Sequence, residues 1–149
     1  MYSCTFIGHY DCSEDIRESI YNAIENLILY EKVQTFYVGT NGRFDYFVYN
    51  ELCKLEKIYN IKIFVVLSYL NNKNKPYYDE KKTLFPSVLE TTPPRFAINK
   101  RNIYMIEKSQ YMICYMNHTF SNTYTFVKKA KRKNLKIFNL GRYDIYDIN

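Results

Sequence analysis

The chain has 149 residues, enough for one domain with a sizeable hydrophobic core. Hydrophobic residues make up 47% and charged residues 24%, a globular composition that excludes an intrinsically disordered chain. No apolar run approaches the roughly 20 residues that span a bilayer, and the first residues lack the pattern of a signal peptide. We therefore expect a single domain over residues 1–149, located in the cytoplasm and without a membrane partner.

The formal net charge of +6 suits an anionic partner such as a nucleotide or a nucleic acid, although a solvated basic surface accounts for it equally well. The four cysteines contain no CxxC pair, and three of them lie in apolar stretches, so we expect reduced, structural side chains. No His, Cys and Asp cluster has metal-site spacing. The sequence thus predicts neither a metal nor a tightly held cofactor.

Strands and helices alternate along the first half of the chain. Residues 2–7 are β-prone, and Asp11 and Glu14, at the spacing of a capping box, precede apolar residues at helical spacing through 16–28. A second strand is expected at 34–39, a helix at 44–58, and a strand at 61–70 that is apolar on both faces, as in a buried parallel strand.

The second half continues the pattern after an irregular stretch, 71–95, that holds all four prolines; loops of this length are functional lids or disordered. A helix at 96–108, a strand at 111–116, a helix at 121–133 and a strand at 135–140 follow, and 141–149 is expected to be a loosely held tail. The alternation predicts an α/β fold: a single Rossmann-like domain with a mainly parallel sheet of about five strands and helices on both faces.

Ligands of such folds bind at the carboxyl ends of the strands, which directs attention to the loops that follow them. The segment GTNGRFD, 39–45, follows the second expected strand; its glycines allow backbone to approach a phosphate, and Arg43 adds a charged donor. Asp45 is placed where it caps the helix or holds a ribose hydroxyl. Equally, the glycines only turn the chain, since the segment is neither GxGxxG nor a P-loop.

Polar residues follow the other strands too. His9 either contacts a ligand or is simply exposed, and Ser121 is also a good N-cap. On the helix at 96–108, Arg95, Asn99 and Asn102 share one face, whereas Arg101 is expected to point elsewhere. The predicted ligand-binding residues are Gly8, His9, Gly39, Thr40, Asn41, Gly42, Arg43, Asp45, Arg95, Asn99, Asn102, Asn117, His118, Ser121 and Asn122.

The chain resembles the SLOG superfamily from about Thr5 to Leu140. The resemblance rests on TFIGHYDC, on FYVGTNGRFD, and on the stretch from PPRFAINKRN through NHTFSNT to LKIFNL. These Rossmann-like domains include the Lonely-guy phosphoribohydrolases and DprA, and the YpsA-like branch of mostly bacterial proteins is the most similar group, which points to a bacterial or phage protein. The resemblance implies a nucleotide or nucleotide-derived ligand at the strand carboxyl ends. It also implies self-association, because SLOG domains commonly pair through helices.

One departure from the family bears on catalysis. The phosphoribohydrolases carry a PGGxGTxxE motif where this chain has HTFSNTYTF, which lacks both the glycine pair and the Glu that cleaves the glycosidic bond. The resemblance thus favours a non-catalytic sensor or sequestering protein. The alternatives are a nucleotide-processing N-glycosidase, with Asp45 as the catalytic candidate, and a single-stranded nucleic-acid-binding module that uses the basic residues from Lys128 to Lys133.

Overall fold

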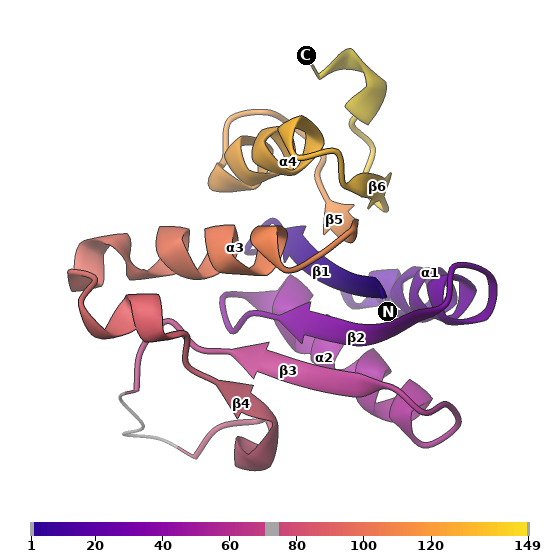
Figure 1. Ribbon diagram of the computed structural model, residues 1–149. Helices are drawn as coiled ribbons and strands as arrows, with labels where there is room; N and C mark the ends of the chain where they lie inside the picture. The colour runs from indigo at the N-terminus through magenta and orange to yellow at the C-terminus, as the bar shows by residue number, and fades with distance from the viewer. Residues whose placement is uncertain (1, 71–74, 149) are drawn as a thin grey trace.

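The computed structural model describes residues 2–70 and 75–148, which build one six-stranded sheet with the order β4-β3-β2-β1-β5-β6 (Figure 1). Every pairing in this sheet is parallel. The expected α/β fold with a parallel sheet is confirmed, with one short strand more than the five expected. The strands are β1 (Tyr2–Gly8), β2 (Val33–Val38), β3 (Lys62–Val66), β4 (Thr83–Leu84), β5 (Tyr111–Tyr115) and β6 (Lys136–Asn139).

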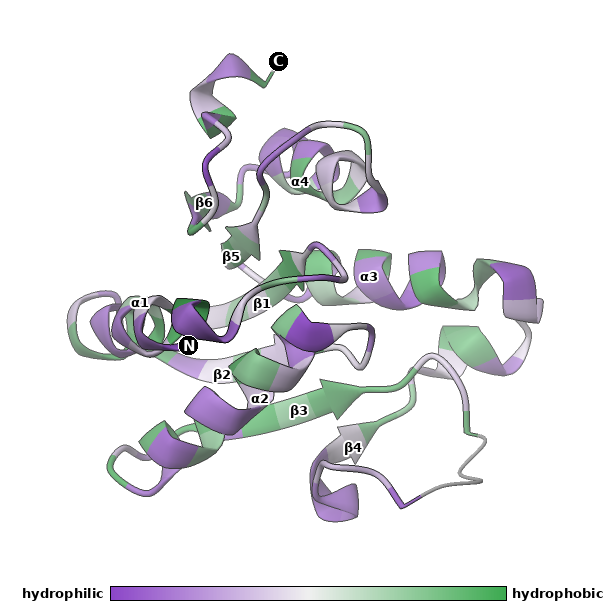
Figure 2. Cartoon of the chain, turned by 180° about the vertical axis from the view of Figure 1, so that it is seen from behind, coloured by the Kyte–Doolittle hydropathy of each residue, from purple (hydrophilic) through white to green (hydrophobic). Residues whose placement is uncertain are grey.

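Helices cover both faces of the sheet. The helices α1 (Arg17–Tyr30) and α2 (Arg43–Glu56) pack against each other on one face, and α3 (Ala97–Glu107) and α4 (Asn122–Arg132) lie on the other (Figures 1 and 2). None of the described helices is long and apolar enough to cross a membrane.

The hydrophobic core follows the two-residue period of the central strands. In β5, Ile113 packs toward α1 and α2, whereas Met112 and Cys114 pack toward α4. All four cysteines are free, and three of them are buried. Burial raises the pKa of the Cys114 thiol to about 12, so this cysteine is an inert core residue at neutral pH.

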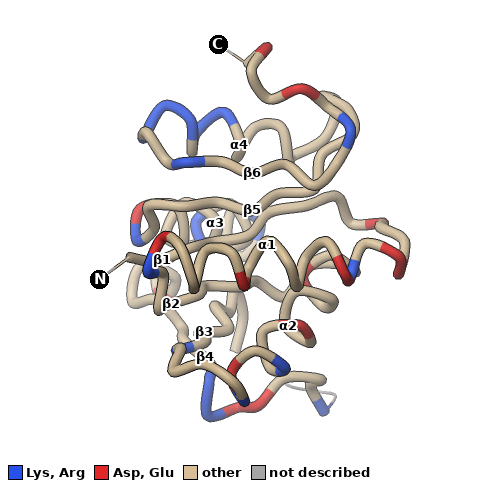
Figure 3. The backbone as a smooth tube through the Cα atoms, turned by 90° about the vertical axis from the view of Figure 1, so that its right-hand side faces the viewer, with Lys and Arg blue, Asp and Glu red and all other residues tan. Residues whose placement is uncertain are grey.

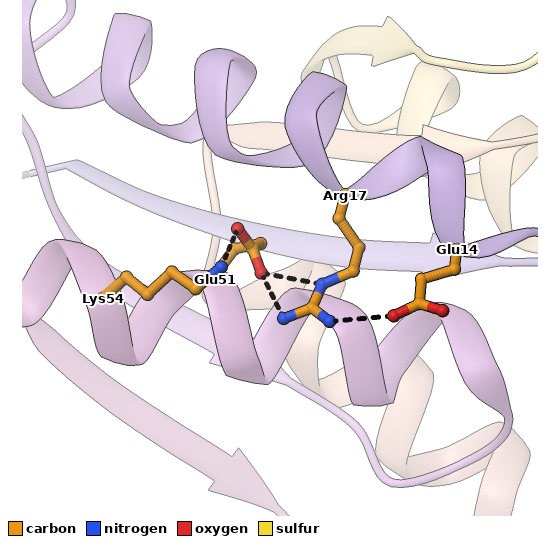
Figure 4. A network of polar contacts seen from close by, with 4 residues as sticks. All are labelled: Glu14, Arg17, Glu51 and Lys54. Carbon is orange, nitrogen blue, oxygen red and sulfur yellow. Dashed lines mark hydrogen bonds and ion pairs between the residues drawn. The ribbon is translucent and has the colours of Figure 1, made fainter.

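An ion-pair network joins the two helices of the first face (Figure 4). The buried carboxylate of Glu51 lies 3.0 Å from both the Arg17 guanidinium and the Lys54 ammonium. Arg17 also pairs with Glu14 at 3.3 Å, so one guanidinium fixes the start of α1 to the middle of α2.

This pairing explains why the expected capping box is absent. A short 3-10 turn, Glu14–Ile16, precedes α1; Ser13 stands at its N-cap position, and no side chain makes a capping hydrogen bond there. The Glu14 carboxylate is used by Arg17 rather than by the backbone at Asp11.

Two further expectations change with the structure. The part of the proline-bearing stretch that is described contains β4, which pairs with β3 through Val65–Thr83 and Val66–Leu84. The stretch 71–95, expected to be either a lid or a disordered loop, includes residues 71–74, which lie outside the described residues.

The segment 141–148 is not a loose tail. The Tyr143 N–H donates to the Met116 carbonyl at 3.0 Å, the Lys131 ammonium donates to the carbonyls of Ile145 and Ile148, and Ile148 is only 2% exposed. The segment is held because its isoleucines cover apolar surface of α4.

Candidate functional site

The strand order places the switch point of the sheet between β1 and β5. From β1 the chain continues to β2 on one side, and from β5 it continues to β6 on the other. The place between the two loops at the carboxyl ends is where ligands of such folds bind, and we call it the crevice by its position in the topology. Residues 9–13 and 116–121 form these loops. The His9 N–H donates to the Tyr115 carbonyl at 3.1 Å and joins the two at their base.

Three aromatic rings from these loops stack into a single column, which we call the ring column: His9, His118 and Phe120. The centroids of His9 and His118 are 4.1 Å apart with the planes at 8°, and those of His118 and Phe120 are 4.0 Å apart at 6°. His9 is 9% exposed, whereas Phe120 is 84% exposed. The column therefore runs from the protein interior to the surface and ends in an open aromatic face.

Hydrogen bonds fix the inner ring of the column. His9 Nε2 accepts the backbone N–H of Asn117 at 2.9 Å, so this nitrogen carries no proton. The proton is assigned to Nδ1, which lies 3.2 Å from the Ser121 hydroxyl. Burial, and then the nearby His118, lower the pKa of His9, so the neutral ring is the native form.

The N-terminus of α4 lies beside the ring column. Ser121 occupies the N-cap position as expected, but it makes no side-chain cap hydrogen bond and its hydroxyl faces His9. The first N–H groups of α4 are thus left without a side-chain cap, at the positive end of the helix dipole. The buried Nδ1 of His118 has no hydrogen-bond partner among the described residues.

The segment 39–45, after β2, differs from the loops of the crevice because its backbone packs closely against the rest of the protein. Gly42 has a φ of 99°, and a Cβ there would lie 2.9 Å from the Tyr10 Cα. The Arg43 N–H already donates to the Tyr10 carbonyl, and the Asn41 N–H to the Asp45 carboxylate, both at 2.9 Å. Two N–H groups expected to meet a phosphate are therefore already bonded within the protein.

The Arg43 side chain is still available to an anion. Its guanidinium lies over the Phe47 ring, 5.1 Å from the centroid, and the residue is exposed. Across residues 2–70 and 75–148 it forms no ion pair, whereas Arg17, over the same ring, is neutralised by Glu51 and Glu14.

A buried polar cluster closes the carboxyl ends of β2 and β3. Arg101, from α3, is 1% exposed and donates to the Val66 carbonyl at 3.2 Å and to the Thr40 hydroxyl at 3.4 Å. Gly39 fits between Arg101 and Asp45, because a Cβ there would lie 2.9 Å from both Arg101 Cζ and Asp45 Oδ2. The absence of a side chain at Gly39 thus lets a buried guanidinium and a buried carboxyl group approach the same point of the loop.

The environment of Asp45 shifts its protonation. The carboxyl is 7% exposed, and burial raises its pKa to about 6 against the opposing effects of Arg101 and the Asn41 N–H. Desolvation accordingly outweighs the attraction of the buried charge. Asp45 faces its protein partners rather than the crevice, and its catalytic role stays a prediction.

The structure corrects the expected basic face of α3. Arg95 and Asn99 are exposed, whereas Asn102 is buried beside Arg101, to which it offers its side-chain oxygen at 2.8 Å. Arg101 does point away from the exposed Arg95 and Asn99, but it is Arg101, and not these two, that reaches the strand ends. Buried Ala97 and Met105 lie four positions on either side of it, and this spacing in the sequence indicates an inward-facing position.

The predicted residues fall into three groups. The crevice brings together the residues of the loops after β1 and β5, and the buried cluster holds those around Asp45. The side chains of Arg43, Arg95 and Asn99 lie on the surface. Sequence reasoning missed Phe120, an aromatic residue in an otherwise polar loop, and Arg142, whose N–H donates to the Asn117 side chain at 2.8 Å. The crevice group is Gly8, His9, Asn117, His118, Ser121 and Asn122.

The lysine-rich end of α4 lies away from the crevice. Because α4 runs antiparallel to the strands it connects, its N-terminus is at their carboxyl ends and its last turn is near their amino ends (Figure 3). A helix of 11 residues is about 16 Å long. Lys131 holds the C-terminal segment, and Lys133 lies 3.8 Å from Glu107.

Comparisons with known proteins bear on the fold. No family model and no curated protein matches the chain. The solved DNA processing protein A of Streptococcus pneumoniae superposes with a TM-score of 0.69 at 14% identity, over 98% of this chain and 52% of that protein. In fold, this chain resembles DprA. It spans about half the length of the pneumococcal protein.

A second DprA structure agrees. The protein from Helicobacter pylori superposes with a TM-score of 0.62 at 12% identity, over 95% of this chain and 66% of that one, and it is described as having a unique single-stranded DNA binding mode. At these identities the likeness establishes the Rossmann-like fold.

Proposed function

We propose that this domain binds single-stranded nucleic acid by stacking an unpaired base on Phe120. The observation that carries the proposal is the ring column, whose outer face is open and whose innermost ring, His9, is fixed by hydrogen bonds. Stacking on an aromatic side chain contributes about 1–3 kcal/mol per base and is tolerant of sequence, because every base has a π-face. A ring that is already held in place loses little freedom on binding.

Phosphate recognition has support around the same crevice. The α4 N-terminus lacks a side-chain cap, the Arg43 guanidinium has no ion-pair partner within the described ranges, and the exposed Arg142 lies next to Asn117. The net charge of +6 favours association with a polyanion. The single-stranded DNA binding described for the Helicobacter pylori protein agrees with this partner class.

A free nucleotide or nucleotide-derived ligand is the second candidate. The column and the uncapped α4 N-terminus are joined by Ser121, so one compact ligand with a base and a phosphate would reach both. In this case the domain is a non-catalytic sensor or sequestering protein, because Asp45 is buried against Arg101. Membership of the YpsA-like branch and self-association stay predictions.

Titration of a fluorescently labelled oligothymidylate at low salt, followed by anisotropy, tests the proposal. Phe120→Ala is expected to weaken binding by about 5- to 100-fold, the equivalent of one stacked base. Tyr30→Ala is the matched control. Tyr30 is 76% exposed and ends α1 just before β2 begins, so it lies at the amino ends of the strands, opposite the crevice.

Competition separates the two candidates. Nucleoside monophosphates that bind with an affinity equal to or above that of the oligomer, and that depend on Phe120, would favour the small-ligand function. A folded protein that binds neither probe at low salt would overturn both, because phosphate-driven binding is strongest there.

A further inference from the structure

The start of the loop that carries Phe120 is bonded to Asn139 and Arg142 at Met116 and Asn117, and one side chain from the other side of the crevice contacts the rest of it. His9, after β1, contacts the β5–α4 loop at three points: the Asn117 N–H, the Ser121 hydroxyl and the His118 ring. We propose that His9 is the positioning residue of the base-stacking platform, and that its protonation releases the loop and weakens nucleic-acid binding in acid. The binding part of this inference rests on the proposed function.

The dependence of Phe120 on His9 follows from the order of contacts. The Phe120 ring rests on His118, which rests on His9, which in turn meets Tyr115 edge-on at 5.9 Å. Phe120 itself is 84% exposed, so it has little other packing to hold it. Loss of the His9 contacts would leave the Phe120 ring free to adopt other rotamers. Binding would then be weaker, because it would cost the conformational entropy of ordering that ring.

Protonation removes the acceptor on which the arrangement depends. An imidazolium donates from both nitrogens, so its Nε2–H would face the Asn117 N–H, donor against donor, at a separation of 2.9 Å. A positive His9 would also stack directly on His118, 4.1 Å away, where a second positive charge is disfavoured.

Within residues 2–70 and 75–148, no acidic side chain contacts His9 to stabilise an imidazolium. The titratable groups facing it are His118 from the β5–α4 loop and Tyr115 from β5, while α2 contributes the Phe44 ring behind Tyr115. On its own loop Asp11 is exposed, and Tyr10 bonds the Arg43 N–H. Among the hydrogen bonds of the described residues, neither His9 nitrogen meets a carboxylate.

The direction of the pH effect follows. Burial, then His118, lower the pKa of His9 below its ordinary 6.5, so the folded platform favours the neutral ring. Its contribution is complete above that ordinary value and is lost as pH falls through the lowered one. Simple charge effects have the opposite sign, because a protein that gains protons binds a polyanion more tightly. Weaker binding in acid is therefore diagnostic.

Two variants separate the roles of His9. His9→Gln keeps an acceptor for the Asn117 N–H and a donor for Ser121 but does not titrate; His9→Phe keeps the stacked ring but has neither polar atom. Between pH 7.5 and 5.5, at constant ionic strength, oligothymidylate binding to the natural protein is expected to weaken about five- to tenfold, the worth of one to two hydrogen bonds. His9→Gln is expected to show no such weakening in acid.

A measurement without ligand keeps the two proposals distinct. The ¹⁵N shifts of the His9 ring and the amide shift of Asn117, followed by NMR from pH 7.5 to 5, should titrate together in the natural protein. The Asn117 amide should be insensitive to acid in His9→Gln and already displaced at pH 7.5 in His9→Phe. If both titrate but no oligomer binds at any pH, the positioning role stands and the proposed function fails. An Asn117 amide that ignores pH and the His9→Phe change would overturn the inference.

Discussion

Two neighbouring pairs of strands, β2 with β3 and β1 with β5, carry similar polar residues at their carboxyl ends, but these residues are buried in one pair and support an exposed ring in the other. At β2 and β3 the loop residues bond one another and Arg101, and the cluster is closed to solvent. At β1 and β5 the polar atoms hold up a column of rings that ends in an exposed face. The polar groups of the glycine-rich loop are thus used within the protein, whereas the glycine-poor loop leaves an aromatic face exposed, at the site that we propose for binding.

Removing the charge at the centre of the closed cluster is the largest perturbation that the comparison predicts. Arg101→Met leaves the Asp45 carboxyl buried without its cation, and breaking a buried pair in this way costs about 3–5 kcal/mol. The cost should be largest near pH 8 and smaller near pH 5, where Asp45 accepts a proton. Urea unfolding at both pH values measures it, with exposed Lys100→Met as the control. Equal losses at both pH values would contradict the assigned partnership.

The titration of Asp45 itself is the next effect in size. Its folded-state pKa, about 6, lies above its ordinary 3.8. The neutral form is thus favoured by folding, and this contribution, complete below pH 3.8, is lost as pH rises through 6. Two pKa units correspond to about 2–3 kcal/mol.

Asp45→Asn keeps the shape and the acceptor for Asn41 but does not titrate. Subtracting its unfolding free energy from that of the natural protein, from pH 4 to 7, isolates Asp45 from the other carboxyls. The difference should fall toward higher pH. A flat difference would contradict the raised pKa of Asp45 by showing that Arg101 and desolvation balance, and a rising one would show that Arg101 outweighs desolvation.

Gly39→Ala tests the closeness of this packing. The added methyl would lie 2.9 Å from Arg101 Cζ and Asp45 Oδ2, and forcing extra atoms into a packed site costs about 1–3 kcal/mol. Oligothymidylate binding per folded molecule should not change, because Gly39 lies in the closed cluster. Thr40→Ser is the mild control, since it keeps the hydroxyl that Arg101 contacts. A binding loss with normal stability would assign the glycine-rich loop to the ligand after all.

The sequence predicts the fold well because the spacing of apolar residues along a segment shows both its type of secondary structure and the face that is buried. The alternation of apolar segments sufficed for the parallel sheet, but the two-residue β4 is too short to show a period and forms only because β3 presents an edge. Helical spacing separates Arg101 from Arg95, Asn99 and Asn102, but only the apolar residues four positions away on either side indicate that it is buried. No sequence pattern reveals that His9, His118 and Phe120 stack, because that depends on how two loops about 108 residues apart meet.

The smallest predicted effect compares a basic residue at the carboxyl ends of the strands, Arg43 at the start of α2, with one near their amino ends, Lys133 after α4. Arg43→Ala, at the crevice end of the molecule, should weaken oligothymidylate binding by about three- to fivefold and reduce the steepness of its salt dependence by about one phosphate contact. Lys133→Ala removes the same formal charge at the other end of the sheet, where Lys133 faces Glu107, and should change binding by less than about twofold. Titrations at several salt concentrations distinguish a local contact from a general charge effect, since only a contact changes the slope. If Lys133→Ala lowered the slope and Arg43→Ala did not, the nucleic acid would follow the lysine-rich end of α4, and the ring column would lose its role as the primary site.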